Sequence, residues 1–224
     1  MSQLNSTRNG CKDVFKAFLV QNAVYAGDLE ILRIAPEEAL PMELIRFSKA
    51  ISRKEDTTHV WVHFYEDDVA FERLWNHPHK YLPILKRYGG VITPDFSLYR
   101  DMPLVMQHWN IYRSRALGFW LQENGIPVIV NIRYGEERTY AVSCLGAPRN
   151  CVFAVGSHGC IKTREDREYF AEGLDYAVRV LSPKTIIVYG TAPDAIFGKY
   201  KARGIRILQF DSDFATTHRK EEAL

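Results

Sequence analysis

Residues 102–132, MPLVMQHWNIYRSRALGFWLQENGIPVIVNI, predict a long helix that is followed at once by a buried strand. Asp101 is the expected N-cap, Pro103 suits the first turn, and Gly125 suits the C-terminal end of this helix. Residues 126–132 are almost entirely apolar, which is typical of a parallel strand that is covered on both faces. The helix is expected to present one apolar face to the sheet, formed by Val105, Trp109, Tyr112, Ala116 and Trp120.

The same alternation of strand and helix runs through most of the chain. Runs rich in β-branched and aromatic residues predict strands at 29–35, 59–65, 90–93, 184–190 and 205–210. Helices are expected at 41–52, at 69–88 with a break near Pro78 and Pro83, from Thr163 to Leu181, and at 192–204. Thr163 and Asp166 have the spacing of a capping box. Residues 138–156 are expected to form two short strands around a Gly-Ala-Pro turn, as an antiparallel excursion.

Strands that alternate with helices of this length imply parallel βαβ units and an α/β fold. We favour a mainly parallel, barrel-like sheet, TIM-like but incomplete, and keep an open doubly wound sheet as the alternative. Residues 23–213 are expected to form a single α/β domain. Residues 1–22 form an N-terminal segment and residues 214–224 a flexible C-terminal tail.

The composition is that of an ordinary globular protein. Of the 224 residues, 46% are hydrophobic and 25% are charged. The net charge of +2 argues against a strong nucleic-acid footprint. No apolar run approaches the length of a membrane span, and the N-terminus lacks the apolar core of a signal peptide. We therefore expect a cytoplasmic protein without membrane contact.

The four cysteines, Cys11, Cys144, Cys151 and Cys160, contain no C-x-x-C pair. Three of them share one short segment with His158, which raises the question of a zinc site. Their spacing is wide and irregular compared with that of known zinc ligands. We expect free thiols and no metal at this position.

Polar residues follow each predicted strand at its C-terminal end. Ligands bind at this edge of parallel α/β sheets, so these side chains are expected to converge on one rim. Some of these polar residues are explained by surface loops and helix caps, which are normally polar. This explanation is weakest for polar residues that directly follow an apolar run. The expected catalytic groups are Asp95, His158 and Asp211, and the expected ligand-binding groups are Asn131, Arg133, Ser157, Gly159 and Tyr189.

Asp95 is assigned as the base or a metal ligand, and His158 as its acid–base partner. A pairing of Asp95 with Glu66 or Asp211 would suit Mg²⁺, so the cofactor is unknown and Mg²⁺ is the candidate. Gln107, Asn110 and Arg113 lie at three-residue spacing on the long helix. They form either a solvated face or a buried polar network.

AVGSHGC, residues 154–160, predicts an anion site. Gly156 and Gly159 permit sharp turns and close approach of a ligand, and a helix N-terminus follows. Arg133 and the amides of 157–160 are the expected anion holders. A simple tight turn before a capped helix would need the same glycines, so the motif is weak.

Three stretches carry a resemblance to a known family: PDFSLY at 94–99, QHWNIYRSR at 107–115 and QENGIPVIV at 122–130. With Ser157–Gly159 and the Tyr189-Gly190 strand end, the chain resembles a bacterial and phage family of uncharacterised proteins, domain of unknown function number four-four-one-seven. The resemblance runs from about Ala23 to Asp213. It implies a cytoplasmic protein of phages and mobile elements and no established reaction. Members often have a tryptophan after the strand at 126–132, where this chain has Ile132-Arg133-Tyr134.

Two classes of function are therefore expected for the rim. The first is an enzyme, a hydrolase or transferase, that acts on a phosphate-bearing small molecule or nucleotide. The second is a non-catalytic phage or mobile-element protein that sequesters a host factor or a signalling nucleotide. A nucleic-acid accessory role is a third alternative, suggested by Arg203, Arg206, Arg219 and Lys220.

Overall fold

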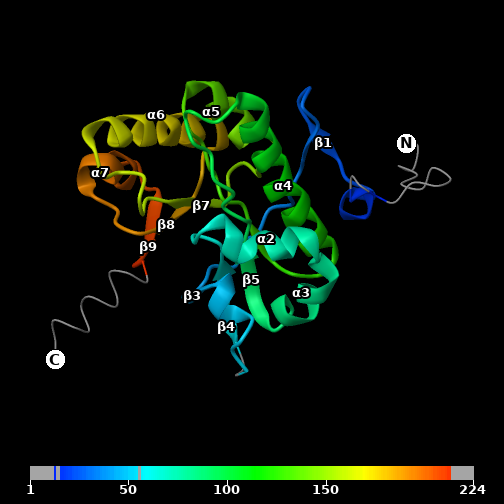
Figure 1. Cartoon of the computed structure of the whole chain (residues 1–224). Coiled ribbons are helices and arrows are strands. Elements are labelled where there is room, and N and C mark those ends of the chain that lie inside the picture. Colours follow the sequence, from blue (N-terminus) through cyan, green and yellow to red (C-terminus); the bar gives the residue numbers. More distant parts are fainter. Residues whose placement is uncertain (1–12, 14–15, 55–56, 213–224) are drawn as a thin grey trace.

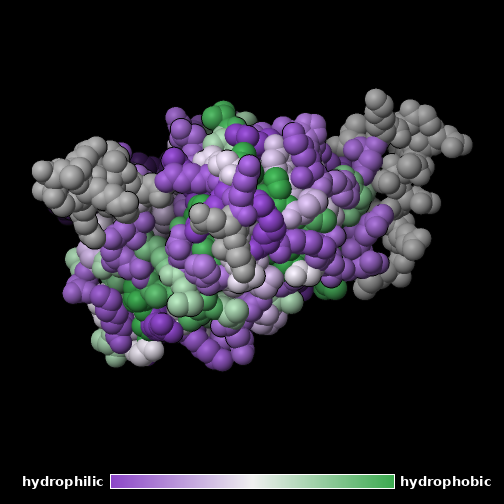
Figure 2. All heavy atoms as spheres, turned by 90° about the horizontal axis from the view of Figure 1, so that it is seen from below, coloured by the Kyte–Doolittle hydropathy of each residue, from purple (hydrophilic) through white to green (hydrophobic). Residues whose placement is uncertain are grey.

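The computed structural model describes residue 13, residues 16–54 and residues 57–212 (Figure 1). The expected tail at 214–224 and most of the expected N-terminal segment lie outside the described residues. So do Cys11, Arg219 and Lys220. In the described ranges no helix is long and apolar enough to cross a membrane. The face seen in Figure 2 is mostly hydrophilic, with hydrophobic side chains in separate patches.

Parallel strands form the centre of the fold. Four of them pair in the order of the chain: β3 (Glu43–Arg46), β4 (Thr57–His63), β5 (Tyr88–Ile92) and β6 (Val128–Ile129). Three more pair in the same way: β7 (Val152–Gly156), β8 (Thr185–Tyr189) and β9 (Arg206–Phe210). A parallel bridge between Asn131 and Ala154 joins the two sheets just beyond β6. The expected α/β class with parallel strands is therefore confirmed.

Helices connect these strands (Figure 1). They are α1 (Phe47–Ala50), α2 (Asp68–Asn76), α3 (Pro78–Leu85), α4 (Leu104–Glu123), α5 (Glu137–Cys144), α6 (Arg164–Leu181) and α7 (Asp194–Ala202). A short 3-10 helix, η1 (Ala17–Val20), and the antiparallel pair β1 (Tyr25–Ala26) and β2 (Ile31–Leu32) precede them. The Thr163–Asp166 capping box opens α6 as expected.

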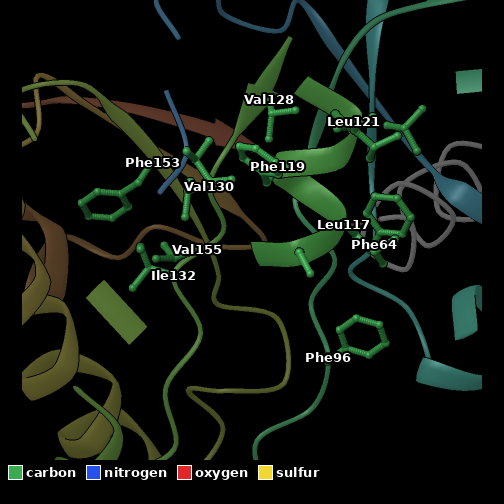
Figure 3. Packing of buried hydrophobic residues seen from close by; sticks show 14 of the residues in the cluster. Phe64, Phe96, Leu117, Phe119, Leu121, Val128, Val130, Ile132, Phe153 and Val155 are labelled. Atoms are coloured by element: carbon green, nitrogen blue, oxygen red, sulfur yellow. The ribbon is translucent and has the colours of Figure 1, made fainter. Parts of the chain in front are cut away.

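The helices cover one face of the strands. Side chains alternate between the two faces of a strand, so Val60, Val62 and Phe64, in and just after β4, lie on the same face. These three residues belong to a buried cluster that also contains residues of α1 to α7. Figure 3 shows α4 on this face, with Leu117 and Leu121 near Val128 and Val130. These four side chains are at most 1% exposed, so α4 is held mainly by burial of apolar surface.

The other face is packed by the strands themselves. Its buried cluster contains no helical residue and consists of Trp61, Ile92, Ile129, Cys151, Val152, Ala154 and Ile187. Tyr65, after β4, stacks on Tyr189 of β8 with ring centroids 4.8 Å apart. In a flat sheet these two strands would lie about 19 Å apart, four strand spacings. The sheet is therefore strongly curved, but no ladder between β3 and β9 closes it within the described residues.

Three expected elements are wrong. Residues 41–52 begin with strand β3 and contain only the single turn α1, because Glu43–Arg46 pair with Val60–His63 at the edge of the sheet. Residues 138–144 belong to helix α5, whose buried residues Tyr140, Ser143 and Cys144 follow helical spacing. The strand expected at 29–35 is only the two-residue β2, which pairs with β1 outside the parallel sheet.

The expected face of α4 is wrong in its first half. Val105 is 73% exposed and Trp109 is 46% exposed. Of the four buried positions from Leu104 to Ser114, Ile111 is apolar and the other three are polar, Gln107, Asn110 and Ser114. The reason is that this part of α4 covers the loop after β5, whose backbone groups need hydrogen-bond partners. The buried network was one of the two alternatives left open for Gln107 and Asn110.

Candidate functional site

A cleft of about 450 Å³ lies at the C-terminal ends of β6 and β7. Its walls come from the loop after β5, the segment after β6, and the loop and first turns of α6. The charged groups on these walls are Arg100, Asp101, Arg133 and Asp166. The aromatic ones are Tyr99, Tyr134, Tyr169 and Phe170. The cleft thus combines ring faces with both signs of charge.

Asp95 lies behind this cleft and is not among the residues that line it. Its carboxylate accepts a 2.6 Å hydrogen bond from Asn131 Nδ2 and lies 3.6 Å from Arg133 Nη1. The Asp95 side chain is 12% exposed. Burial raises the pKa of Asp95, while Arg133 and the Asn131 hydrogen bond oppose that rise. In this position the Asp95 carboxylate contacts Asn131 and Arg133, and its role as a base stays a prediction.

Arg133 has donors left over after these contacts. Its Nη1 donates to the sulfur of Cys160 at 3.1 Å. Asp95 raises the pKa of Arg133 above its usual range, so the guanidinium stays charged. Within the described part of the chain its buried Nε has no partner, and Nη2 forms no hydrogen bond. A buried donor without a partner costs about 1–3 kcal/mol, and this cost applies to Nε, whereas Nη2 is not among the buried unpaired atoms.

Asn131 links the cleft to the inner face of the sheet. Its Oδ1 accepts a 3.0 Å hydrogen bond from the Tyr65 hydroxyl, while its Nδ2 serves Asp95. Tyr65 packs on Gly156 so closely that a Cβ there would lie 2.8 Å from the Tyr65 ring. Burial raises the pKa of Tyr65 well above its ordinary value, so its hydroxyl remains a donor. Gly156 is therefore required by the Tyr65 ring, in addition to its place in the cleft.

A buried arginine on α4 fixes the segment after β6 from the other side. Arg115 is 2% exposed and donates to Asn131 O at 3.1 Å and to Ser143 O at 2.6 Å. Burial lowers its pKa to about 10, which leaves it charged at neutral pH. Ser114 adds a 2.6 Å hydrogen bond to Pro94 O, ahead of Asp95. The backbone on both sides of the Asp95–Asn131 contact is thus tied to α4.

The expected anion-binding amides are mostly in use. The N–H groups of Ser157 and His158 both donate to Tyr189 O, and that of Cys160 donates to Ser157 O. At the start of α6, Thr163 and Asp166 cap each other, and Glu165 adds a second acid to the first turn. Acidic side chains there already occupy the favourable place for an anion. Arg133 is therefore the main anion-binding group that the cleft offers.

The remaining expected residues lie along the same rim in different surroundings. Ser157 is buried and its hydroxyl donates to Thr191 O at 2.7 Å, so it holds the turn together. Gly159 lines the cleft. His158 is exposed, and Asp211 accepts a 3.2 Å hydrogen bond from Gln209. No described hydrogen bond or ion pair joins Asp95 to His158 or Asp211, and the acid–base set expected for these three residues stays a prediction.

Glu66, the other carboxylate considered as a partner of Asp95, has a backbone hydrogen-bond partner of its own. Glu66 accepts a 2.9 Å hydrogen bond from Ser48 N–H. Among the residues that the structure describes, no group of three or more His, Cys, Asp and Glu side chains is placed to hold a metal ion. Cys144 and Cys151 are buried and separate, while Cys160 faces the cleft.

Sequence reasoning missed several residues of this site. Tyr65 is expected only as the end of the strand at 59–65, and Arg115 only as part of the stretch 107–115. The aromatic wall at Tyr134 and Tyr169 carries no spacing motif that could have found it. Arg115 could have been suspected of being buried, since it lies within the stretch from Ile111 to Leu121, which is almost entirely buried.

Residues 23–211 match the model of the family described as "Domain of unknown function (DUF4417)". The chain belongs to this family. The DUF4417 match covers the whole parallel sheet and the cleft, and it confirms the resemblance seen in the sequence.

Two curated relatives are phage proteins. The Gene 1 protein of Mycobacterium phage D29 is 35% identical over 129 residues, which are 58% of this chain and 48% of that protein. The Gene 1 protein of Mycobacterium phage L5 is 36% identical over 129 residues, 58% of this chain and 56% of that protein. The DUF4417 chain thus spans about half the length of these relatives. No solved structure matches it.

Proposed function

We propose that the cleft binds a small molecule through a phosphate or carboxylate group that Arg133 holds. The guanidinium of Arg133 carries the proposal, because Asp95 and Cys160 fix one of its nitrogens while Nε and Nη2 have no partner in the described structure. The planar fork of arginine matches an oxyanion with two parallel hydrogen bonds. An oxyanion would satisfy donors that are otherwise costly.

The walls favour a nucleotide or another phosphate-bearing molecule with a flat group. Tyr99, Tyr134 and Tyr169 line the cleft, and aromatic side chains stack on bases. The Arg100 guanidinium lies over the Tyr169 ring, 4.6 Å from its centre, which supports stacking of a flat group at this ring. Arg100 also pairs with Asp166 at 3.1 Å, and a phosphate would compete for it.

In this proposal the protein is a phage or mobile-element enzyme, a hydrolase or transferase, with a binding protein that sequesters a nucleotide as the alternative. A nucleic-acid accessory role stays a third alternative, and two lysines near Arg203 are paired with acids, Lys199 with Asp175 and Lys201 with Asp194. We also propose that the curved sheet is an incomplete TIM-like barrel, which the Tyr65–Tyr189 stack between β4 and β8 supports.

Isothermal titration calorimetry of the full chain against inorganic phosphate and a panel of nucleotides and phosphometabolites, with and without Mg²⁺, tests the proposal. We expect binding of at least one phosphate compound. Arg133→Lys keeps the charge beside Asp95 but loses the fork, and should weaken that binding by about tenfold to a hundredfold. Turnover of the bound compound identifies an enzyme, and stoichiometric binding without turnover identifies a binding protein.

Arg138→Lys is the matched control, because Arg138 pairs with Glu136 on the surface and does not line the cleft. It should bind like the wild type. Failure of every compound to bind, or equal affinities of Arg133→Lys and Arg138→Lys, would refute the proposal. Thermal unfolding of each variant shows whether it is folded when it is titrated.

A further inference from the structure

The three cysteines in the described part of the chain differ in their surroundings. Cys144 is buried, and burial raises its pKa to about 11. Cys151 is buried as well and donates a 2.8 Å hydrogen bond to Glu37 O. Cys160 is partly exposed and lines the cleft. Among these described thiols, Cys160 is the one that a small molecule in the cleft would meet.

The sulfur of Cys160 lies in an electropositive place. It accepts the 3.1 Å hydrogen bond from Arg133 Nη1, and Arg133 is itself one of the residues that line the cleft. Reactive cysteines typically occupy such partly exposed, positively charged surroundings. Gly159, next to Cys160, has φ 80°, and nothing lies within 4 Å of the point where a Cβ would be. The approach to this turn is therefore open.

We propose that Cys160 is a nucleophile that attacks a small electrophile whose carboxylate or phosphate group is held by Arg133. The choice of anion holder rests on the function proposed above. In the step, sulfur forms a bond to the electrophilic carbon, the leaving group departs with its bonding electron pair, and the thiol proton passes to solvent. Because one guanidinium contacts both the sulfur and the anion, it fixes the distance between the two reacting groups.

Iodoacetate and iodoacetamide test this step, because they share a leaving group and differ in charge. Labelling of Cys11→Ser protein is followed at each remaining cysteine by mass spectrometry. Cys160 should react first. For Cys160, the rate of reaction with iodoacetate is divided by the rate with iodoacetamide, and this ratio is then divided by the same ratio measured for free N-acetylcysteine. The normalised ratio should be about 10. Inorganic phosphate should slow the iodoacetate reaction selectively.

Arg133→Lys should lower this normalised ratio toward 1, whereas Arg138→Lys should leave it unchanged. A Cys160 that reacts no faster than Cys144 or Cys151, or that shows no preference for iodoacetate, overturns the inference. If Cys160 is inert while Arg133-dependent phosphate binding is present, this inference fails and the proposed function stands.

Discussion

Asp95 has a carboxyl group that ionises less readily in the folded protein than in water. Burial raises its pKa above the usual 3.8, and the favourable contacts with Arg133 and Asn131 offset only part of that rise. The folded protein therefore binds this proton more tightly than the unfolded chain does. The stabilising contribution of Asp95 is fully present below pH 3.8 and is lost as the pH rises through the folded pKa.

Asp95→Asn removes this titration and keeps the shape of the side chain. The free energy of unfolding of the wild type minus that of Asp95→Asn should fall as the pH rises from about 3.5 to 7. Urea unfolding of both proteins at a series of pH values measures the difference, and the other titrating groups cancel in it. A difference that grows with pH would mean that Arg133 outweighs burial and lowers the Asp95 pKa.

Single residues of the site were predictable where they directly follow the end of a predicted strand. Asp95, Asn131 and Arg133 follow apolar runs, and the structure places all three in one cluster. The contacts of the Asp95 carboxylate were not predictable, because Asn131 and Arg133, which make them, belong to another part of the chain. The contact between Arg133 and Cys160 joins segments 27 residues apart, and nothing in either segment points to the other.

Two glycines inside helices show that the same substitution can have opposite effects. Glycine in a helix interior costs about 0.5–1 kcal/mol relative to alanine. In α7, a Cβ at Gly198 would meet only Asp194 Cβ at 3.6 Å, an ordinary contact. In α6, a Cβ at Gly173 would lie 2.3 Å from the ring of Tyr134. The Tyr134 hydroxyl donates to Phe170 O at 2.7 Å, so this ring has little freedom to move.

Gly198→Ala should therefore raise the free energy of unfolding by up to about 1 kcal/mol. Gly173→Ala should lower it by about 1–3 kcal/mol, because the overpacked ring must shift. Urea unfolding of the two variants beside the wild type measures both, and each is the control for the other. A stabilised Gly173→Ala would show that Tyr134 relaxes freely and that α6 does not hold this wall of the cleft.

At the level of elements, the sequence predicted a helix or strand correctly where its buried residues recur at the regular spacing of that element. The strands at 59–65 and 184–190 and the buried stripe of α6 have such patterns, and the structure contains them. The pattern failed at 138–144, where Thr139, Tyr140 and Val142 favour a strand by propensity but the helix packs between α4 and α6. It failed at β3 because four residues are too few to separate a strand from a helical turn.

The two parallel sheets are held together by shared hydrophobic core packing more than by backbone hydrogen bonds between strands. Between the two parallel sheets only the bridge of Asn131 with Ala154 is described, with 2.8 Å hydrogen bonds on either side. The largest buried cluster, by contrast, contains residues of β4, β5 and α4 together with residues of β7, β8 and α6. Arg115 adds a link from α4 to Ser143 of α5. Unfolding either half would expose the apolar surface of the other.

We therefore expect both halves to unfold in one transition. All four tryptophans, Trp61, Trp75, Trp109 and Trp120, precede β6 and lie in the part of the chain that contains β4, β5 and α4, so their fluorescence reports on that part. Urea-dependent labelling of the buried thiols Cys144 and Cys151, assigned by mass spectrometry, reports on the second. The two midpoints should coincide, as two-state unfolding requires. If the fluorescence changes while both thiols stay protected, the sheets are separate folding units, and a cleft built on β6 and β7 would lie at the boundary between them.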